Sequence, residues 1–349
     1  MKGAVYYGPR DIRIESVADP EPGPGEVLIE VARNGICGSD LHTYVGAKAG
    51  GATMHVPGVV LGHEFSGIVR ALGPGVDDLP VGTAVAVAPI EYCGQCYACE
   101  HGWPNMCRKL AIYGGYRRPL HGGLAPYVAV SRRSVFEVPA GLDVNTAALA
   151  EPVAVAVHAV RRAPVTFGAS VMVLGAGPIG LAVLQSVLAA GASTVIVSEV
   201  SAALRAAALQ FGARVAVDPT VDNLRQVVRD LSPNGLDLVF DTTAVHAAIN
   251  SGIAALRPRG TLVSVAGWQD QAHLDMGVAM AKEIDIVFSM TYQPRVDFPI
   301  ALQLLAIGGL DGPGMISDHI PLEQLIDQGF EELLHHADRH IKILVNPAN

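Results

Sequence analysis

The chain has 349 residues, half of them hydrophobic, and a formal net charge of −9. Because a single hydrophobic core usually stops growing at about 250 to 300 residues, this length predicts two domains. The acidic balance and the lack of a Lys/Arg-rich block argue against nucleic acid or an anionic membrane as a partner. No apolar run approaches the roughly 18 residues that a membrane helix needs.

The N-terminus places Arg10 and Asp11 before any apolar stretch of signal-peptide length, so we expect a cytoplasmic protein. That compartment keeps thiols reduced. The five cysteines are therefore expected to bind metal or to react, and not to form disulfides.

The first 150 residues are rich in Gly and Pro and predict an irregular, barrel-like β region. Short β-type runs alternate there with Pro-Gly clusters such as PEPGPG. The expected strands are AVYY (4–7), EVLIEVA (26–32), FSGIVRAL (65–72) and TAVAVAP (83–89).

Three separated stretches of this region carry potential metal ligands: GICGSDLH (35–42), LGHEFSG (61–67) and LAEPVAVAVHA (149–159). A catalytic zinc needs about three protein ligands and one exchangeable position, and mixed Cys, His and carboxylate ligation suits it. Cys37, His63 and a glutamate, either Glu64 or Glu151, would supply that set. The pattern leaves open that Cys37 is a small buried hydrophobe and that the His-Glu pair belongs to a turn.

Four cysteines lie within EYCGQCYACEHGWPNMC at Cys93, Cys96, Cys99 and Cys107. Four thiolates this close can close a tetrahedral zinc shell with no open position, which predicts a structural zinc. An iron-sulfur cluster is the main alternative, but ferredoxin spacing ends in a three-residue gap followed by Pro, and here the gap is seven residues. A redox C-x-x-C would be expected beside a thioredoxin-like βαβ unit, whereas this stretch lies in a loop region.

From about Pro164 apolar runs alternate with Ala- and Leu-rich helical stretches, which predicts a doubly wound parallel sheet built from βαβ units. A helix over 178–192 is expected between the first two strands. The six expected strands are SVMVLG (170–175), TVIVSE (194–199), RVAVD (214–218), LDLVFD (236–241), GTLVSVAG (260–267) and DIVFSM (285–290).

A Gly-rich turn follows the first of these strands and opens the helix. Gly175, Gly177 and Gly180, with Pro178 and Ile179 inside the turn, have the G-x-G-x-x-G spacing of dinucleotide binding. Glycines allow the tight turn, the approach of the pyrophosphate and close packing of helix on strand, and the phosphates would lie at the positive end of the helix dipole. The turn therefore predicts a dinucleotide cofactor.

Glu199 ends the second strand, nineteen residues after Gly180, where a carboxylate would accept hydrogen bonds from the adenosine ribose. A carboxylate there would repel the 2′-phosphate of NADP, so NAD is favoured. Arg205 could instead reach a 2′-phosphate or stack on adenine, or it could be an exposed helix residue.

The last part of the chain predicts a helix over 299–309 and then a helix and a strand over 330–346. We expect this segment to return to the first domain. The predicted division is therefore residues 1–153 with 291–349 as a catalytic, zinc-binding domain, and residues 154–290 as the cofactor domain.

These stretches together resemble the zinc-dependent medium-chain alcohol and polyol dehydrogenase family, nearest its butanediol and sorbitol dehydrogenase branch, over nearly the whole chain. GICGSDLH, LGHEFSG, the four-cysteine lobe, EPVAVAVHAV, VLGAGPIGL and HIKILVNP carry the resemblance. It implies a GroES-like catalytic domain, a Rossmann domain and two zinc ions per chain.

The resemblance also implies residue roles. Cys37, His63 and either Glu64 or Glu151 would hold the catalytic zinc, and Asp40 would accept from the free nitrogen of His63.

Three further roles follow from the same family pattern. Ser39 and His42 would relay the substrate proton, and Lys342 would lie near the cofactor phosphates unless it is an exposed strand lysine. The expected protein is a homo-oligomeric, NAD-dependent dehydrogenase of secondary alcohols or vicinal diols, with 2,3-butanediol and acetoin as the expected pair.

Other functions are left open. A sorbitol, xylitol or L-threonine dehydrogenase of the same architecture is the nearest alternative. An iron-sulfur electron-transfer protein and a catalytically silent nucleotide-binding protein are alternatives of a different class.

Overall fold

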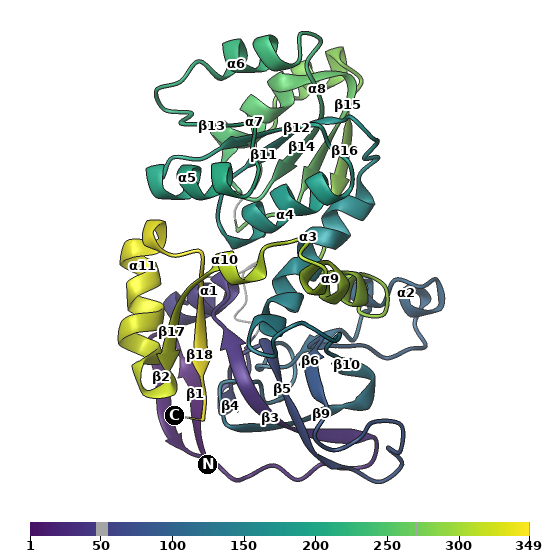
Figure 1. Ribbon diagram of the computed structural model, residues 1–349, viewed down its shortest axis with the longest axis vertical. Coiled ribbons are helices and arrows are strands. Elements are labelled where there is room, and N and C mark those ends of the chain that lie inside the picture. The colour runs from purple at the N-terminus through teal and green to yellow at the C-terminus, as the bar shows by residue number, and fades with distance from the viewer. Residues whose placement is uncertain (47–54, 270, 349) are drawn as a thin grey trace. The chain divides into compact units, whose positions relative to one another are not determined.

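The computed structural model describes residues 1–46, 55–269 and 271–348 and divides the chain into two compact units (Figure 1). Unit 1 comprises Met1–Glu151, Gln293–Gly308 and Gly312–Asn349, and unit 2 comprises Pro152–Tyr292 and Gly309–Asp311. The predicted boundaries at residues 153 and 291 lie close to these limits. The sequence did not indicate the short return of Gly309–Asp311 to unit 2.

Unit 1 is built from mixed and antiparallel β-sheets. Its largest sheet runs β10-β6-β5-β3-β18-β17, with β9 also paired to β3, and smaller sheets run β2-β1-β4 and β7-β8. The strands of the first 137 residues are β1 Lys2–Gly8, β2 Asp11–Ser16, β3 Glu26–Gly35, β4 Val59–Val60, β5 Glu64–Leu72, β6 Ala84–Val87, β7 Ile90–Glu91, β8 Ala111–Ile112, β9 Tyr127–Ser131 and β10 Val135–Glu137. All four predicted strands are present.

Alternation of side chains explains why β3 lies inside this sheet. Val27, Ile29 and Val31 are buried with almost no exposure, and the residues between them are half-buried. These side chains join a core with Phe65, Val85 and others from β5, β6, β9 and β10. The packed strands form a rigid base for the residues at their ends.

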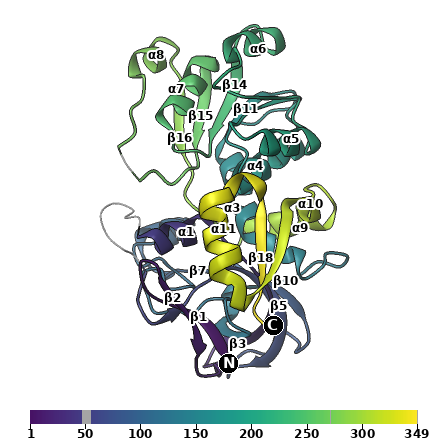
Figure 2. The same ribbon diagram turned by 90° about the vertical axis from the view of Figure 1, so that its left-hand side faces the viewer.

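The C-terminal segment returns to unit 1, as the sequence predicts (Figure 2). Strand β18, Lys342–Asn346, pairs in parallel with β17, Ile316–Pro321, and antiparallel with the end of β3. The predicted terminal helix takes the form of a π-helical turn, Leu325–Glu331, followed by α11, Glu332–His336. Residues from both ends of the chain therefore share one sheet and one hydrophobic core.

Unit 2 contains six parallel strands in the order β13-β12-β11-β14-β15-β16. This is the order of a doubly wound dinucleotide-binding fold, and all six predicted strands are confirmed. The strands are β11 Ser170–Leu174, β12 Thr194–Ser198, β13 Val215–Val217, β14 Leu236–Asp241, β15 Leu256–Ser264 and β16 Asp285–Phe288. Because both faces of the sheet are covered, β11 and β12 are continuous apolar runs.

Besides α11, further helices connect the strands of the two units. They are α1 Gly38–Val45, α2 Tyr97–Glu100, α3 Ala150–Arg162, α4 Pro178–Ala189, α5 Ala202–Gln210, α6 Leu224–Leu231, α7 His246–Ala255, α8 Met276–Ala281, α9 Asp297–Ala306 and α10 Gly312–Met315. Short 3-10 turns lie at Pro104–Met106, Arg132–Ser134, Thr146–Leu149, Leu322–Gln324 and Ala337–Arg339. Within the described residues, none of the helices has the length and apolar character needed to cross a bilayer.

Candidate active site and metal centres

Helix α1 presents the GICGSDLH motif from its first turns. Cys37 is its N-cap, and the backbone N–H of Cys37 donates to Asp40 Oδ2 at 3.0 Å, which closes a capping box. Asp40 is buried, whereas Ser39 and His42 are exposed. Since residues three apart share one side of a helix, Ser39 and His42 lie on the same side of α1.

Cys37, His63 and Glu64 come together at the adjoining ends of β3 and β5. One ligand atom from each lies within 4.8 Å of the other two. His63 Nδ1 is 3.4 Å from Asp40 Oδ1, and its Nε2 is 3.5 Å from Ser39 Oγ. A thiol, a carboxylate and an imidazole whose second nitrogen is held by Asp40 form a donor set that fits zinc.

His63 and Asp40 are largely buried, and each changes the pKa of the other. Burial alone would lower the pKa of His63, but Asp40 and Cys37 outweigh it and hold that pKa well above its ordinary value. Burial likewise opposes the charge of Asp40, and the interaction with His63 lowers the Asp40 pKa despite it. Asp40 is therefore the main neighbour that offsets the burial of His63.

The geometry distinguishes the two glutamates that the sequence left open. Glu64 is 1% exposed and belongs to the group with Cys37 and His63. Glu151, in the first turn of α3, lies outside that group. It is still close enough for its charge to contribute to the raised pKa of Lys342.

Lys342 is buried in unit 1, which contradicts one of the two alternatives that the sequence left open. It is 3% exposed, so it is not an exposed strand lysine. Its ammonium group donates to both carboxylate oxygens of Glu64, at 2.9 and 2.8 Å, and to the carbonyl of Ile36 at 2.9 Å. These three acceptors all belong to unit 1, and the predicted place of Lys342 near the cofactor phosphates stays a prediction.

The four-cysteine lobe brings its sulfurs together around one point. Cys96 Sγ lies 3.6 Å from Cys99 Sγ and 3.8 Å from Cys107 Sγ, and Cys107 Sγ lies 3.5 Å from Cys93 Sγ. Four sulfurs at the tetrahedral Zn–S bond length would lie about 3.8 Å apart. Backbone N–H groups of Cys99 and Arg108 lower the pKa of Cys96 to about 6, whereas burial raises the pKa of Cys99.

The Gly-rich turn in unit 2 has a distinct reason for each glycine. Gly175 has a φ of 91°, in the left-handed region that favours glycine. A Cβ on Gly180 would lie 2.1 Å from the carbonyl oxygen of Gly175, so only glycine lets the helix pack this closely. A Cβ on Gly177 would meet nothing within 4 Å, which leaves an open approach at the start of α4. Pro178 and Ile179 form the first turn of that helix.

Glu199 lies directly beside this turn. Its carboxylate accepts from the backbone N–H groups of Ala176 and Ser201, both at 2.8 Å. Arg205 donates to the Glu199 carbonyl at 2.8 Å and pairs with Asp218 at 3.1 Å, so it is not a free helix residue. The structure therefore brings the predicted ribose-binding carboxylate to the predicted phosphate-binding turn.

Each of the two units contains a segment that matches a known family model. Residues 23–140 match the model of the alcohol dehydrogenase GroES-like domain, and residues 178–306 match that of the zinc-binding dehydrogenase. The sorbitol dehydrogenase of Bacillus subtilis is 32% identical over 99% of this chain and 97% of its own length. The chain belongs to the zinc-dependent medium-chain dehydrogenase family.

Two solved structures of such dehydrogenases are similar over 99% of both chains. The 2R,3R-butanediol dehydrogenase of Bacillus subtilis has a TM-score of 0.89 and 33% identity. A candidate zinc-binding dehydrogenase from Sinorhizobium meliloti 1021, solved bound to NADP, has a TM-score of 0.88 and 31% identity. These likenesses confirm the predicted fold and the predicted zinc-type oxidoreductase class.

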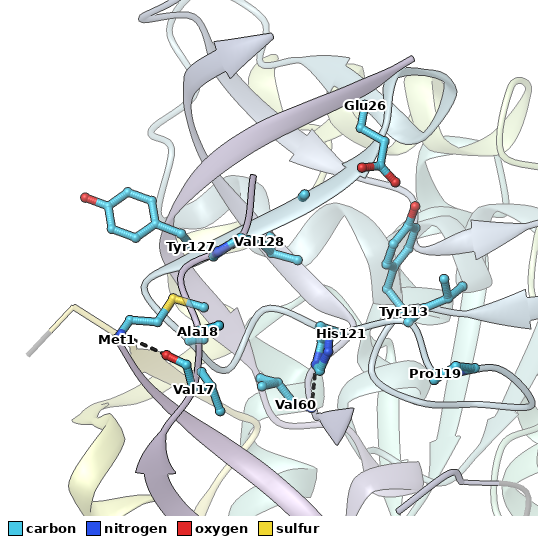
Figure 3. Close-up of a pocket in the computed structure, with 15 residues that line it drawn as sticks. Met1, Val17, Ala18, Glu26, Val60, Tyr113, Pro119, His121, Tyr127 and Val128 are labelled. Carbon is cyan, nitrogen blue, oxygen red and sulfur yellow. Dashed lines mark hydrogen bonds between the residues drawn. The ribbon is translucent and has the colours of Figure 1, made fainter. Parts of the chain in front are cut away.

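A cavity of about 300 Å³ also lies within unit 1 of this dehydrogenase (Figure 3). It is lined by Met1, Val60, Tyr113, His121 and neighbouring side chains, and none of the predicted site residues is among its described lining. Two of its polar groups already have partners within unit 1: His121 Nδ1 accepts from the Val60 N–H, and the Met1 ammonium donates to the Val17 carbonyl. We assign this cavity no part in the dehydrogenase chemistry.

The sequence did not single out two residues that support helix α1. Thr43 Oγ1 donates to the Ser39 carbonyl at 2.9 Å and lies 3.0 Å from His55 Nδ1. His55 in turn contacts the rings of Tyr6 and Tyr116. No short motif identifies such a contact, because His55 and Thr43 meet only after the strands have paired.

Proposed function

We propose that this zinc-type dehydrogenase uses NAD to oxidise secondary alcohols and vicinal diols, with (R,R)-2,3-butanediol and acetoin as its substrate pair. The grouping of Cys37, His63 and Glu64 beside the exposed Ser39 carries the proposal. The choice of diol is supported by the likeness to the Bacillus subtilis butanediol dehydrogenase.

Zinc, when bound, would supply a Lewis acid that acidifies the substrate hydroxyl, and NAD would accept the hydride from the carbinol carbon. Ser39 would accept the proton of the substrate hydroxyl, and the exposed His42 would release it to solvent. Asp40 holds His63 with its other nitrogen free for the metal. The alcohol thus loses a hydride and a proton and becomes a ketone.

NAD is proposed over NADP because of Glu199. Its carboxylate stands beside the Gly-rich turn, where it would bond the ribose hydroxyls and repel a 2′-phosphate. The related Sinorhizobium meliloti structure holds NADP, so the choice depends on this chain's own residues.

The substrate is tested with initial rates on a panel containing (R,R)-2,3-butanediol, sorbitol, xylitol, L-threonine and 2-butanol, each with NAD. We expect the highest kcat/KM with butanediol. Turnover of a polyol or threonine, with none of butanediol, would reject the diol and favour the function named for the sorbitol dehydrogenase relative. The Cys37→Ala variant is the control and should lose turnover, and the pure protein should be colourless, unlike an iron-sulfur protein.

The cofactor is tested with Glu199→Gln, which keeps the size of the side chain and one of its two acceptor oxygens and removes its charge. We expect the ratio of kcat/KM for NAD to that for NADP to fall at least about tenfold, since repulsion of the 2′-phosphate is lost. Glu283→Gln, on an exposed carboxylate of unit 2, is the matched control and should leave the ratio unchanged. An unaltered ratio in Glu199→Gln would refute the assigned role.

A further inference from the structure

Lys342, a buried lysine of the C-terminal strand, contacts the residues that adjoin Cys37 and His63 in the sequence. Lys342 opens β18, and its ammonium group donates to Ile36, which precedes Cys37, and to Glu64, which follows His63. The Lys342 and Glu64 side chains are 2% and 1% exposed. The pair is therefore shielded from water, which strengthens its interaction.

The surrounding strands hold this contact in place. Gly35 of β3 pairs with Glu64 of β5 on one side and with Leu344 of β18 on the other. A Cβ on Gly35 would lie 2.1 Å from Glu64 Oε2, so the absent side chain makes room for the carboxylate. The three strands fix both Glu64 and Lys342 independently of any metal.

Lys342 and a metal ion compete for the same carboxylate. Glu64 lies within 4.8 Å of the ligand atoms of Cys37 and His63, yet both of its oxygens already accept from the ammonium group. A carboxylate held on both oxygens by a cation is a weaker metal ligand. A catalytic zinc needs a coordination position that substrate can enter.

We propose that Lys342 is a positioning residue that holds Glu64 back from full metal ligation and so keeps a coordination position exchangeable. This inference rests on the proposed function, because it requires a metal at Cys37 and His63. Through Glu64, the C-terminal strand would then influence the candidate metal site.

The test replaces the catalytic metal with Co²⁺, whose visible absorption reports its ligands. In Lys342→Met the freed Glu64 should bind the metal firmly. We expect a changed cobalt spectrum, metal loss to a chelator slowed about tenfold or more, and a lower kcat, on the scale typical of residues that contact metal ligands. Lys342→Arg, which keeps the charge and donors, should restore the original spectrum.

Lys282 supplies a matched control in unit 2. Its ammonium group also has three acceptors, the carbonyls of Ile253, Ala254 and Leu256. Lys282→Met should leave the cobalt spectrum and the rate of metal loss unchanged.

An unchanged spectrum and an unchanged rate of metal loss in Lys342→Met would overturn the inference and leave Lys342 as a structural ion pair. Should that variant fail to fold, Lys342→Gln, which keeps a donating NH2 group and removes the charge, is held to the same two readouts. Original protein that takes up metal only in the cysteine lobe would instead overturn the proposed function, so the two failures are distinguishable.

Discussion

Asp40 links the start of helix α1 to a ligand residue. One carboxylate oxygen accepts from the Cys37 N–H at 3.0 Å, and the other lies 3.4 Å from His63 Nδ1. The first contact fixes the helix end that carries Cys37, and the second selects the tautomer of His63. A single buried carboxylate thus orients two of the three side chains that fit zinc.

This double role gives a residue-scale prediction for Asp40→Asn. The amide can still cap the helix, but it lacks the charge that holds His63, so zinc affinity at the catalytic site should fall about 10- to 100-fold. Competition with a chromophoric chelator measures it. Asp143→Asn, at another carboxylate that accepts backbone N–H groups in unit 1, should leave zinc affinity unchanged. Equal affinities in the two variants would show that the charge of Asp40 has no such role.

Residue identity predicted the ligand types but not all of their partners. Cys37, His63 and both glutamates could be named from their motifs, whereas the grouping of Glu64, and not Glu151, with Cys37 and His63 depends on how β3 and β5 pair. The burial of Lys342 was missed because its partner, Glu64, lies 278 residues away in sequence. The one local signal is that three apolar residues directly follow it in the strand KILVN.

At the scale of elements, the four-cysteine lobe has little regular structure of its own. Between β7 and β8 it contains one four-residue helix, α2, and a three-residue 3-10 turn. Neither is long enough to be stable alone. The fold of this segment therefore depends on what the four sulfurs bind.

We predict that Cys107→Ser lowers the zinc content from two ions to one per chain and lowers Tm by about 5 °C or more, the change expected for a loss of roughly 2 kcal/mol. Elemental analysis and calorimetry measure the two effects. Cys37→Ser is the contrasting variant: it should also lose one zinc and lose turnover, but with a smaller change in Tm. A Tm unaffected by Cys107→Ser would mean that the lobe folds without its metal.

The elements predicted best from the sequence are those in which consecutive residues already show which faces are buried. Mainly apolar runs identified β11 and β12, because both faces of a parallel sheet are covered. The two-residue strands β4, β7 and β8 carry no such pattern and form only through their partners. The spacing of apolar residues likewise did not predict the π-helical turn before α11.

At the scale of the whole molecule, the two units differ in how many separate segments of the chain form them. Unit 1 requires distant segments, since β18 lies between β3 and β17 in its main sheet. Unit 2 is almost one continuous segment, Pro152–Tyr292, with its own core of residues such as Met172, Ile196 and Phe240. Truncation should therefore damage unit 1 far more than unit 2.

We predict that residues 152–292 alone fold cooperatively and bind NAD without zinc. The fragment keeps the Gly-rich turn and Glu199, and it loses only Gly309–Asp311, including the hydrogen bond from the Asp311 N–H to Gln185. At about 100 times Kd, NAD should stabilise it by about 2.7 kcal/mol, which raises Tm by roughly 10 °C.

Gly177→Val is the control: its side chain enters space that is open in the protein, so the fragment should fold but show no NAD-dependent shift. A fragment without a cooperative transition would mean that unit 2 needs unit 1 to fold, and a shift that persists in Gly177→Val would place the cofactor away from the Gly-rich turn.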